Sequence, residues 1–183
     1  PISIYSAVGR ASKDGVLIKG GRYLEALGKM KALAFDKTKT LTSGTPEITD
    51  ILPFTSMSRE DLLSCAAGIE FFSEHPLAKS ILAQAEKENL TLHDVENFES
   101  FQGKGVKADC LVCDTRQHCL GKLSFILENH EVPEFVRKQV HQLQEQGKTV
   151  LLISSAKQVE GLIALMDTIL PDAQDTIHRL KKM

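Results

Sequence analysis

The sequence predicts an α/β protein whose parallel-sheet core is interrupted by an inserted domain of α+β character. Short apolar runs at both ends of the chain alternate with helix-like segments, which is typical of parallel sheets. The middle of the chain instead combines helices with strands and turns, and the composition changes at residues 43–46 (SGTP). We therefore expect the chain to leave one domain there and to enter a second.

The first part of the chain is expected to carry two helices and two strands. In order, these are a helix over 2–13, a short strand over 16–19, a short helix after Gly21 and a buried parallel strand over 31–35. The length of this last run, KALAF, favours a strand over a helix. Asp36 follows it directly, and chemistry in open α/β sheets gathers beyond the carboxyl ends of strands. Asp36 is therefore the first candidate site residue.

Helix starts are the clearest local signals in the rest of the chain. Ser58 and Asp61 resemble a capping box, and Pro76 suits the first turn of a helix. We expect a strand over 47–53, helices over 59–71 and from 76, strands and turns over 96–120, helices over 122–129 and 133–147, strands over 149–154 and 159–166, and a final helix from 171.

Composition and charge exclude several classes of protein. The net charge of -2 and the pI near 6.3 provide no basic field for nucleic acid or for an anionic membrane. No run reaches the roughly 18 consecutive apolar residues that a membrane span needs. The 4 cysteines indicate a reducing cytosol rather than a disulfide framework. Both ends begin or stop abruptly, so we expect a fragment of a longer protein.

The segment DKTKTLT, residues 36–42, is the most informative in the chain. It resembles the DKTGTLT signature of P-type ATPases, which belong to the haloacid dehalogenase-like superfamily. The resemblance implies covalent catalysis, in which the Asp36 carboxylate attacks the γ-phosphate of ATP. It also implies that Asp36 and the Thr38 backbone carbonyl hold Mg²⁺, and that Thr40 or Lys37 lines the phosphate site.

Two positions in this segment carry further expectations. Phosphatases of the superfamily have a second Asp, a general acid and base, where this chain has Thr38. Without that base an aspartyl phosphate should last longer, which suits an ion pump. The family has glycine where Lys39 stands. Because glycine permits close approach of phosphate, we expect Lys39 to impair activity.

Further segments resemble the heavy-metal-transporting, type IB branch of these ATPases. They are GVLIKGGRYLEALGKMKALAFDKT, SEHPLA (73–78), FQGKGV (101–106), LGKL (120–123) and the tail GLIALMDTILPDA. Carried over position by position, the resemblance implies that Glu70 and His75 contact adenine. It also implies that Gly103, Gly105 and Gly121 let the backbone approach the nucleotide. Asp167 matches an acidic residue that organises the phosphorylation site, although a helix cap explains it equally well.

The resemblance also implies a domain organisation. Residues 1–45 and 157–183 would belong to a partial haloacid dehalogenase-like phosphorylation domain, and residues 46–156 to an inserted α+β nucleotide-binding domain with an antiparallel sheet. The family places two more motifs, TGD and GDGxNDxP, after the part that this chain matches. We therefore expect this chain to bind ATP with Mg²⁺ but to turn ATP over poorly.

The implied setting is the cytoplasmic domain of an integral membrane protein. Its partners would be the membrane, actuator and remaining phosphorylation parts of the same ATPase, and the transported ion would be handled by membrane segments outside this chain. The flank LEALGKMKALAFDKT resembles zinc, cadmium and cobalt pumps more than copper pumps.

Three alternatives to a pump remain at this point. One is a haloacid dehalogenase-like phosphatase, against which Thr38 argues, and another is a non-catalytic nucleotide-binding module. The third is a metal-binding module that uses Cys110 and Cys113, with His118 and Cys119 nearby. Residues three apart on a strand point to opposite faces, so the two thiols meet only if a turn intervenes. A structural role for these cysteines is favoured.

Overall fold

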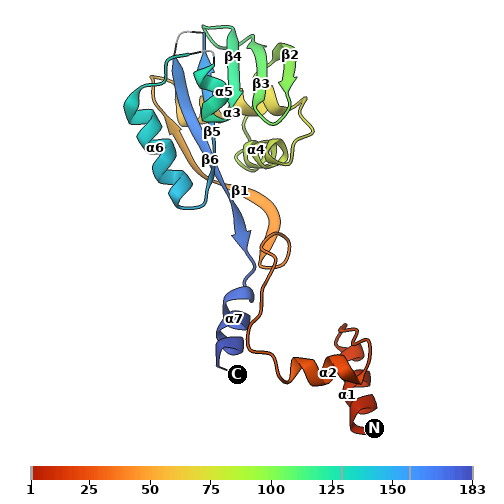
Figure 1. Ribbon diagram of the computed structural model, residues 1–183. Helices are drawn as coiled ribbons and strands as arrows, with labels where there is room; N and C mark the ends of the chain where they lie inside the picture. The colour runs from red at the N-terminus through yellow and green to blue at the C-terminus, as the bar shows by residue number, and fades with distance from the viewer. Residues whose placement is uncertain (1, 129, 157, 183) are drawn as a thin grey trace. The chain divides into compact units, whose positions relative to one another are not determined.

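The computed structural model describes residues 2–128, 130–156 and 158–182 (Figure 1). It divides into two compact units, one ending at Asp36 and one beginning at Lys37. The smaller unit contains helices α1 (Ile2–Lys13) and α2 (Gly21–Leu27), which confirms both helices expected there. No described side chain of this unit is buried.

The two strands expected in the smaller unit, over 16–19 and 31–35, do not form. Every strand that the described residues form belongs to the larger unit, and none of them pairs with these segments. An isolated strand leaves its backbone groups without ladder partners, so it gains nothing over an irregular chain. Leu33 and Phe35 are accordingly exposed. The prediction of a buried parallel strand leading to Asp36 is therefore wrong in this structure.

The larger unit is built on a six-stranded sheet with the order β1-β6-β5-β4-β3-β2, in which all pairs are antiparallel. The strands are β1 (Thr42–Pro53), β2 (Val95–Phe101), β3 (Gly105–Cys110), β4 (Gln117–Gly121), β5 (Thr149–Ser155) and β6 (Val159–Ile169). Strands β2 to β6 follow one another across the sheet in sequence order. The first strand, β1, pairs with the last strand, β6, and forms an edge of the sheet. The expected antiparallel sheet is thus confirmed.

Helices cover both faces of this sheet (Figure 1). One buried cluster joins α3 (Arg59–Glu70) and α4 (Pro76–Lys87) to one face, and the other joins α5 (Leu123–Leu127) and α6 (Glu134–Glu145) to the opposite face. Helix α3 is the most deeply packed, because all of its residues from Leu62 to Glu70 are buried. Helix α7 (Ala173–Lys181) follows β6. All five helices were expected from the sequence; Asn129, the expected end of one, lies outside the described residues.

Local side-chain chemistry explains where α3 and α4 begin. The Ser58 side chain accepts a hydrogen bond from the Asp61 backbone N–H, which confirms the predicted cap. The His75 Nδ1 accepts from the Leu77 N–H at 3.2 Å, and Pro76 occupies the first helical turn. His75 is therefore fixed at the N-terminus of α4 by its own ring.

Strands β1 and β6 run beyond the packed part of the sheet as a two-stranded ribbon (Figure 1). Their pairing extends from Pro53 with Gly161 to Thr42 with Ile169, and the last four residues of β6 are no longer buried. Because β6 lies between β1 and β5, it shares one sheet with the middle of the chain.

The predicted division of the chain into 1–45, 46–156 and 157–183 stays a prediction. Pro1, Lys157 and Met183 lie outside the described residues.

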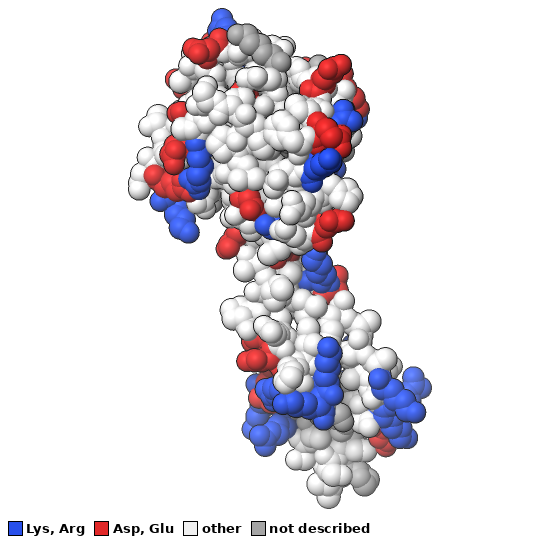
Figure 2. Space-filling view, turned by 90° about the vertical axis from the view of Figure 1, so that its left-hand side faces the viewer, with Lys and Arg blue, Asp and Glu red and all other residues white. Residues whose placement is uncertain are grey.

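The surface carries both signs of charge. Figure 2 shows acidic and basic side chains interspersed over the larger unit, in keeping with the net charge of -2. Among the described residues, no helix combines the length and the apolar character needed to span a bilayer.

Candidate functional site

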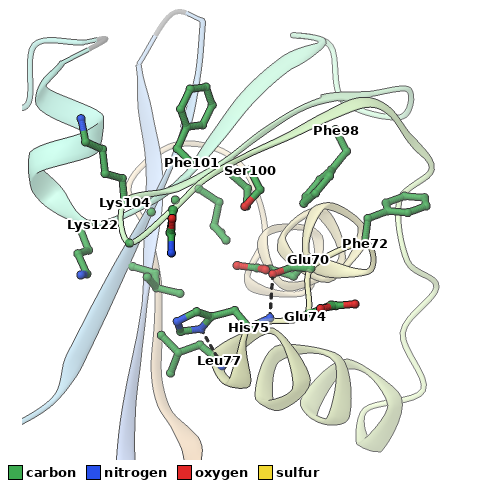
Figure 3. Close-up of a pocket in the computed structure, with 18 residues that line it drawn as sticks. Glu70, Phe72, Glu74, His75, Leu77, Phe98, Ser100, Phe101, Lys104 and Lys122 are labelled. Atoms are coloured by element: carbon green, nitrogen blue, oxygen red, sulfur yellow. Dashed lines mark hydrogen bonds between the residues drawn. The ribbon is translucent and has the colours of Figure 1, made fainter.

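A pocket of about 620 Å³ lies where the end of α3, the start of α4 and the ends of β2, β3 and β4 meet (Figure 3). It brings together all five residues that the sequence proposed for nucleotide contact: Glu70, His75, Gly103, Gly105 and Gly121. These residues come from segments far apart in the chain, so their meeting in one cavity is a property of the fold. Contact with a nucleotide itself stays a prediction.

Glu70 contributes a buried carboxyl group to this pocket. It is the last residue of α3 and only 5% exposed, and its Oε2 has no hydrogen-bond partner among the described residues. Burial raises the pKa of Glu70, and a hydrogen bond with the Ser73 side chain offsets part of this rise. A buried polar atom without a partner is costly, so Glu70 is suited to a ligand that donates a hydrogen bond.

His75 offers a hydrogen-bond donor on the same side of the pocket. Its Nδ1 is already an acceptor from the Leu77 N–H, so the neutral ring carries its proton on Nε2. The ring lines the cavity while it caps α4 (Figure 3). Capping and ligand contact are therefore compatible roles for this one residue.

The glycines of the pocket have structural reasons of their own. Gly105 on β3 and Gly121 on β4 are paired across the two strands. A Cβ added at Gly105 would lie 2.4 Å from the Leu120 carbonyl oxygen, and a Cβ added at Gly121 would lie 2.6 Å from the Lys104 carbonyl oxygen. Close strand contact thus requires both glycines, whatever the ligand. Gly103 has a φ of 72°, which glycine adopts readily, and an added Cβ there would meet open space.

The two ends of the pocket differ in character. Figure 3 shows Phe72 and Phe98, with ring centroids 5.9 Å apart, at one end and Lys104 and Lys122 at the other. The Lys104 Nζ also forms an ion pair with Glu128 at 2.8 Å. Sequence reasoning did not single out these four residues. The two lysines lie within the segments FQGKGV and LGKL and could have been found there, whereas the aromatic pair had no local signal.

The loop with the signature segment is exposed. Asp36, Lys37, Thr38, Lys39 and Thr40 are all accessible to solvent. Residues 37–42 form a turn whose centre is the Lys37 carbonyl oxygen, which accepts from the backbone N–H of residues 41 and 42 and from the side chain of the latter. The backbone carbonyls of this turn and the Asp36 carboxylate are oxygen donors of the kind that Mg²⁺ binds.

Lys39 adopts a left-handed conformation, with a φ of 60°. A residue with a side chain pays roughly 1–2 kcal/mol for this conformation, whereas glycine does not. The stem of Lys39 also lies against Gly44, since a Cβ added there would meet the Lys39 Cγ. Glycine suits this position because it adopts the left-handed conformation without strain, whereas lysine adds strain and a side chain that packs against Gly44.

Asp167 ties the strand after the signature loop to β6. Its carboxylate accepts hydrogen bonds from the side chains of Thr42 and Ser43 and from the Gly44 N–H at 2.9 Å. The Thr42 hydrogen bond lowers the pKa of Asp167 most, followed by the Gly44 and Ser43 contacts. The alternative of a helix cap is wrong, because Asp172 holds the N-cap position of α7. Asp167 therefore positions the segment that follows the loop.

The cysteine pair does not behave as the sequence predicted. Residues 111–115 leave the strand and bend, so the thiols of Cys110 and Cys113 lie 3.3 Å apart instead of on opposite faces. Cys119 packs into the cluster on the other face of the sheet, away from this pair. His118 is buried on the side of the pair. Burial lowers the pKa of His118, but the contacts with Cys113 and with the Arg116 carbonyl together outweigh this and raise it.

A family model described as haloacid dehalogenase-like hydrolase matches residues 30–183. The chain belongs to the haloacid dehalogenase-like hydrolase family. Within this family it is 40% identical over its whole length to a "Probable cadmium-transporting ATPase" of Alkalihalophilus pseudofirmus, of which it covers 26%. It is 34% identical over its whole length to a "Copper-exporting P-type ATPase" of Bacillus subtilis, of which it covers 22%. The chain thus spans about a quarter of the length of the curated relatives it matches.

Comparison with solved structures agrees with this result. A crystal structure of a zinc-transporting PIB-type ATPase in the E2.Pi state matches with a TM-score of 0.82 and 34% identity, covering 98% of this chain and 28% of the other. The N-domain of HMA8, a copper-transporting P-type ATPase, matches with a TM-score of 0.56 at 21% identity, over 66% of this chain and 99% of the other, and shows the fold alone. The predicted fold class and the resemblance to type IB P-type ATPases are confirmed. The phosphatase and metal-module alternatives to a pump are not favoured.

Proposed function

We propose that this chain is the ATP-binding and phosphorylation part of a P-type ATPase that exports divalent heavy-metal ions through an aspartyl-phosphate intermediate. One observation carries the proposal: a single pocket contains a buried carboxyl, Glu70, whose Oε2 has no partner among the described residues, together with a hydrogen-bond donor, His75, and two lysines at its other end. This polarity fits a ligand with a flat, hydrogen-bonding base at one end and phosphates at the other.

In this proposal the adenine of ATP lies at the end of the pocket that contains Glu70 and His75. The exocyclic amine of adenine donates a hydrogen bond to the Glu70 Oε2. A ring nitrogen of adenine accepts a hydrogen bond from the His75 Nε2–H. Phe72 and Phe98 offer ring surface for stacking. The phosphates point towards Lys104 and Lys122, whose ammonium groups provide the positive charge that phosphates require.

Phosphoryl transfer is proposed at Asp36. Its carboxylate oxygen forms a bond to the γ-phosphorus while the bond from that phosphorus to the β,γ-bridging oxygen breaks, and ADP leaves. Mg²⁺, when bound, neutralises charge on the transferring phosphate, and the Asp36 carboxylate with the Thr38 carbonyl would hold it. Lys37 and Thr40 are proposed to contact the phosphoryl oxygens. Thr38 provides no general base for water, so the phosphoaspartate persists.

The transported ion and the location are part of the same proposal. Names of relatives include cadmium and copper, and a solved structure with 34% identity is described as zinc-transporting. We favour a zinc, cadmium or cobalt pump over a copper pump. In the complete pump this part would lie on the cytoplasmic side, with residues 46–156 as the nucleotide-binding domain and its two flanks in the phosphorylation domain. Transport assays of the full-length protein with each metal would decide between the ions.

The decisive experiment is to trap phosphate on Asp36 from γ-labelled ATP and Mg²⁺. Calorimetry of the 183-residue chain is expected to show ATP binding, whereas its steady-state turnover is expected to be slow. In the full-length protein, acid-stable label should appear and should be absent in Asp36→Asn. The Lys39→Gly variant is expected to label faster, because it removes the side chain and the left-handed strain beside the nucleophile.

Two results would contradict this proposal. If the purified chain, folded by circular dichroism, shows no ATP binding at millimolar nucleotide, the pocket has another ligand. If the full-length protein hydrolyses generic phosphate esters rapidly and never retains label on Asp36, the chain belongs to a phosphatase instead.

A further inference from the structure

Four metal-ligating side chains converge in the larger unit, away from the nucleotide pocket. They are Cys65 on α3, His93 in the connection before β2, Cys110 at the end of β3 and Cys113 in the bend that follows. One ligand atom from each lies within 4.8 Å of all the others. Sequence spacing showed only the Cys110 and Cys113 pair, because the other two residues are brought to it by the fold.

The distances suit one tetrahedral ion. In a tetrahedral zinc site with sulfur ligands at about 2.3 Å, neighbouring sulfur atoms are about 3.8 Å apart. Here the Cys110 and Cys113 sulfurs are 3.3 Å apart, and the His93 Nδ1 lies 3.4 and 3.5 Å from them. A small outward movement of each side chain would admit the ion. Thiols that only fill an apolar core need no ring nitrogen among them.

Backbone contacts hold the three ligand-bearing segments in place. The His93 N–H donates to the Ser64 carbonyl on α3, and the Leu111 N–H donates to the Asp94 carbonyl. Gly68 permits this approach, because a Cβ there would lie 2.2 Å from the His93 carbonyl oxygen. The Cys113 N–H also donates to the Cys110 sulfur at 3.4 Å, which supports a thiolate there. The cluster is therefore organised before any ion arrives.

An approach for a cation is present. A second pocket of about 470 Å³ has His93 and Cys113 in its wall and carries the carboxylates of Asp61, Asp114 and Glu160. These acidic groups favour entry of a cation. This second pocket shares no lining residue with the nucleotide pocket. Cys65 and Cys110 at its inner side are fully buried, so a bound ion would be shielded from water.

The chemistry of the cluster fits a divalent cation. Three thiols and one imidazole offer the sulfur and nitrogen ligands that zinc binds. A cation that binds the sulfur atoms displaces the thiol protons, which are released.

We propose that Cys65, His93, Cys110 and Cys113 form a closed, tetrahedral Cys₃His site for a zinc-class divalent cation. Three thiolates and one neutral imidazole ligate the ion, and the displaced protons go to solvent. The ion joins α3 to β3 and to the bend that follows it, so its role is to stabilise the inserted domain. The same two elements carry Glu70 and Gly105 of the nucleotide pocket. The proposal does not depend on what that pocket binds.

The test uses the 183-residue chain, reduced and stripped of metal, with Co²⁺ as a spectroscopic probe. One equivalent of Co²⁺ is expected to give thiolate-to-cobalt charge transfer and intense visible bands of tetrahedral cobalt, which one equivalent of Zn²⁺ then removes. Zn²⁺ at 100 times its dissociation constant should raise the melting temperature by about 5 °C or more.

Variants distinguish the four proposed ligands from Cys119, the cysteine that lies outside the cluster. Cys113→Ser and His93→Gln alter half-buried residues and should weaken Co²⁺ binding about tenfold or more. Cys119→Ser, a cysteine change on the opposite face of the sheet, should leave the cobalt spectrum unchanged. Circular dichroism checks that each variant is folded.

Three results would overturn the proposal. The reduced wild-type chain could show no thiolate-to-cobalt absorption, or Cys113→Ser could retain the full wild-type spectrum. Mass spectrometry could also show a Cys110–Cys113 disulfide as the functional state, with the reduced chain binding no metal. In that case the cluster is a redox pair, not a metal site.

Discussion

The two compact units contain similar apolar sequences but bury them very differently. In residues 2–36 no described side chain is buried, and large apolar residues such as Leu17 and Tyr23 are exposed. In the described residues of 37–182, apolar positions of β1, β3, β4, β5 and β6 and of helices α3 to α6 form two buried clusters. The comparison teaches that an apolar run becomes a strand only where neighbouring strands supply hydrogen bonds and cover.

The same contrast separates the two candidate sites. The pocket proposed for the nucleotide is formed entirely by residues of the larger unit, although each of its sequence signals is weak by itself. The signature segment is the strongest signal in the sequence, yet Asp36 is the last residue of the unpacked unit. We therefore propose that nucleotide binding depends on the larger unit, whereas phosphoryl transfer also requires Asp36.

The largest expected effect tests the difference in packing. Leu152 on β5 is fully buried, so Leu152→Ala should lower the free energy of unfolding by about 3 kcal/mol. Leu17 is 78% exposed, and Leu17→Ala should change the free energy of unfolding by no more than about 0.5 kcal/mol. Urea denaturation followed by circular dichroism measures both. Equal losses would mean that the smaller unit is packed in solution.

The next prediction compares a residue of the pocket, His75, with a residue of the signature loop, Asp36, in their effect on ATP affinity. In His75→Asn the new side chain can still cap α4 but lacks the imidazole, so ATP affinity should fall about tenfold, or about 1.4 kcal/mol. Asp36→Asn should not weaken ATP binding. Calorimetry on both variants gives the comparison. Unchanged affinity in His75→Asn, with α4 intact, would remove His75 from the binding site.

A smaller effect concerns the buried carboxyl of the pocket. Because burial raises the pKa of Glu70, its contribution to stability is present at low pH and is lost as the pH rises through the raised value. Glu70→Gln should therefore stabilise the ligand-free chain at pH 7 by about 1 kcal/mol. The gain should vanish below about pH 4. Thermal unfolding across this range tests the sign, and Glu74→Gln, an exposed change in the same pocket, is the control.

The smallest effect concerns an ion pair between two helices. Arg59 at the start of α3 contacts both Glu88 carboxylate oxygens, at 2.7 and 2.8 Å, and the Arg59 hydrogen bonds lower the pKa of Glu88 to about 2. The stabilisation is present above the ordinary range of Glu and is lost as the pH falls through about 2. Glu88→Gln should cost about 0.5 kcal/mol at pH 7 and nothing in strong acid. Glu60→Gln, 3.8 Å from the same arginine, should cost less.

Features with local causes were predictable from the sequence. The Ser58 cap and the Pro76 turn depend on residues within one helical turn, so the starts of α3 and α4 could be predicted. The pairing of β1 with β6 depends on residues more than a hundred positions apart and left no local trace. The strand at 31–35 was predicted from length and apolarity alone, which do not show whether a partner strand exists.

The candidate sites follow the same rule. The five proposed nucleotide contacts were found because each lies in a short matched segment, and Phe72 and Phe98 were missed because their pairing requires the folded pocket. Cys110 and Cys113 were visible as a pair, but the bend after Cys110 was not anticipated. Cys65 and His93 could not be connected with them, since α3 and the connection before β2 meet only in the fold.

The β1 and β6 ribbon has a mechanical consequence. The chain enters the sheet along one of these strands and leaves along the other, so both connections pass through a single narrow stem. A stem of two strands bends and twists more easily than the six-stranded body to which it is attached. The hydrogen bonds that the Asp167 carboxylate accepts from Thr42 and Gly44 hold the two strands of this stem together.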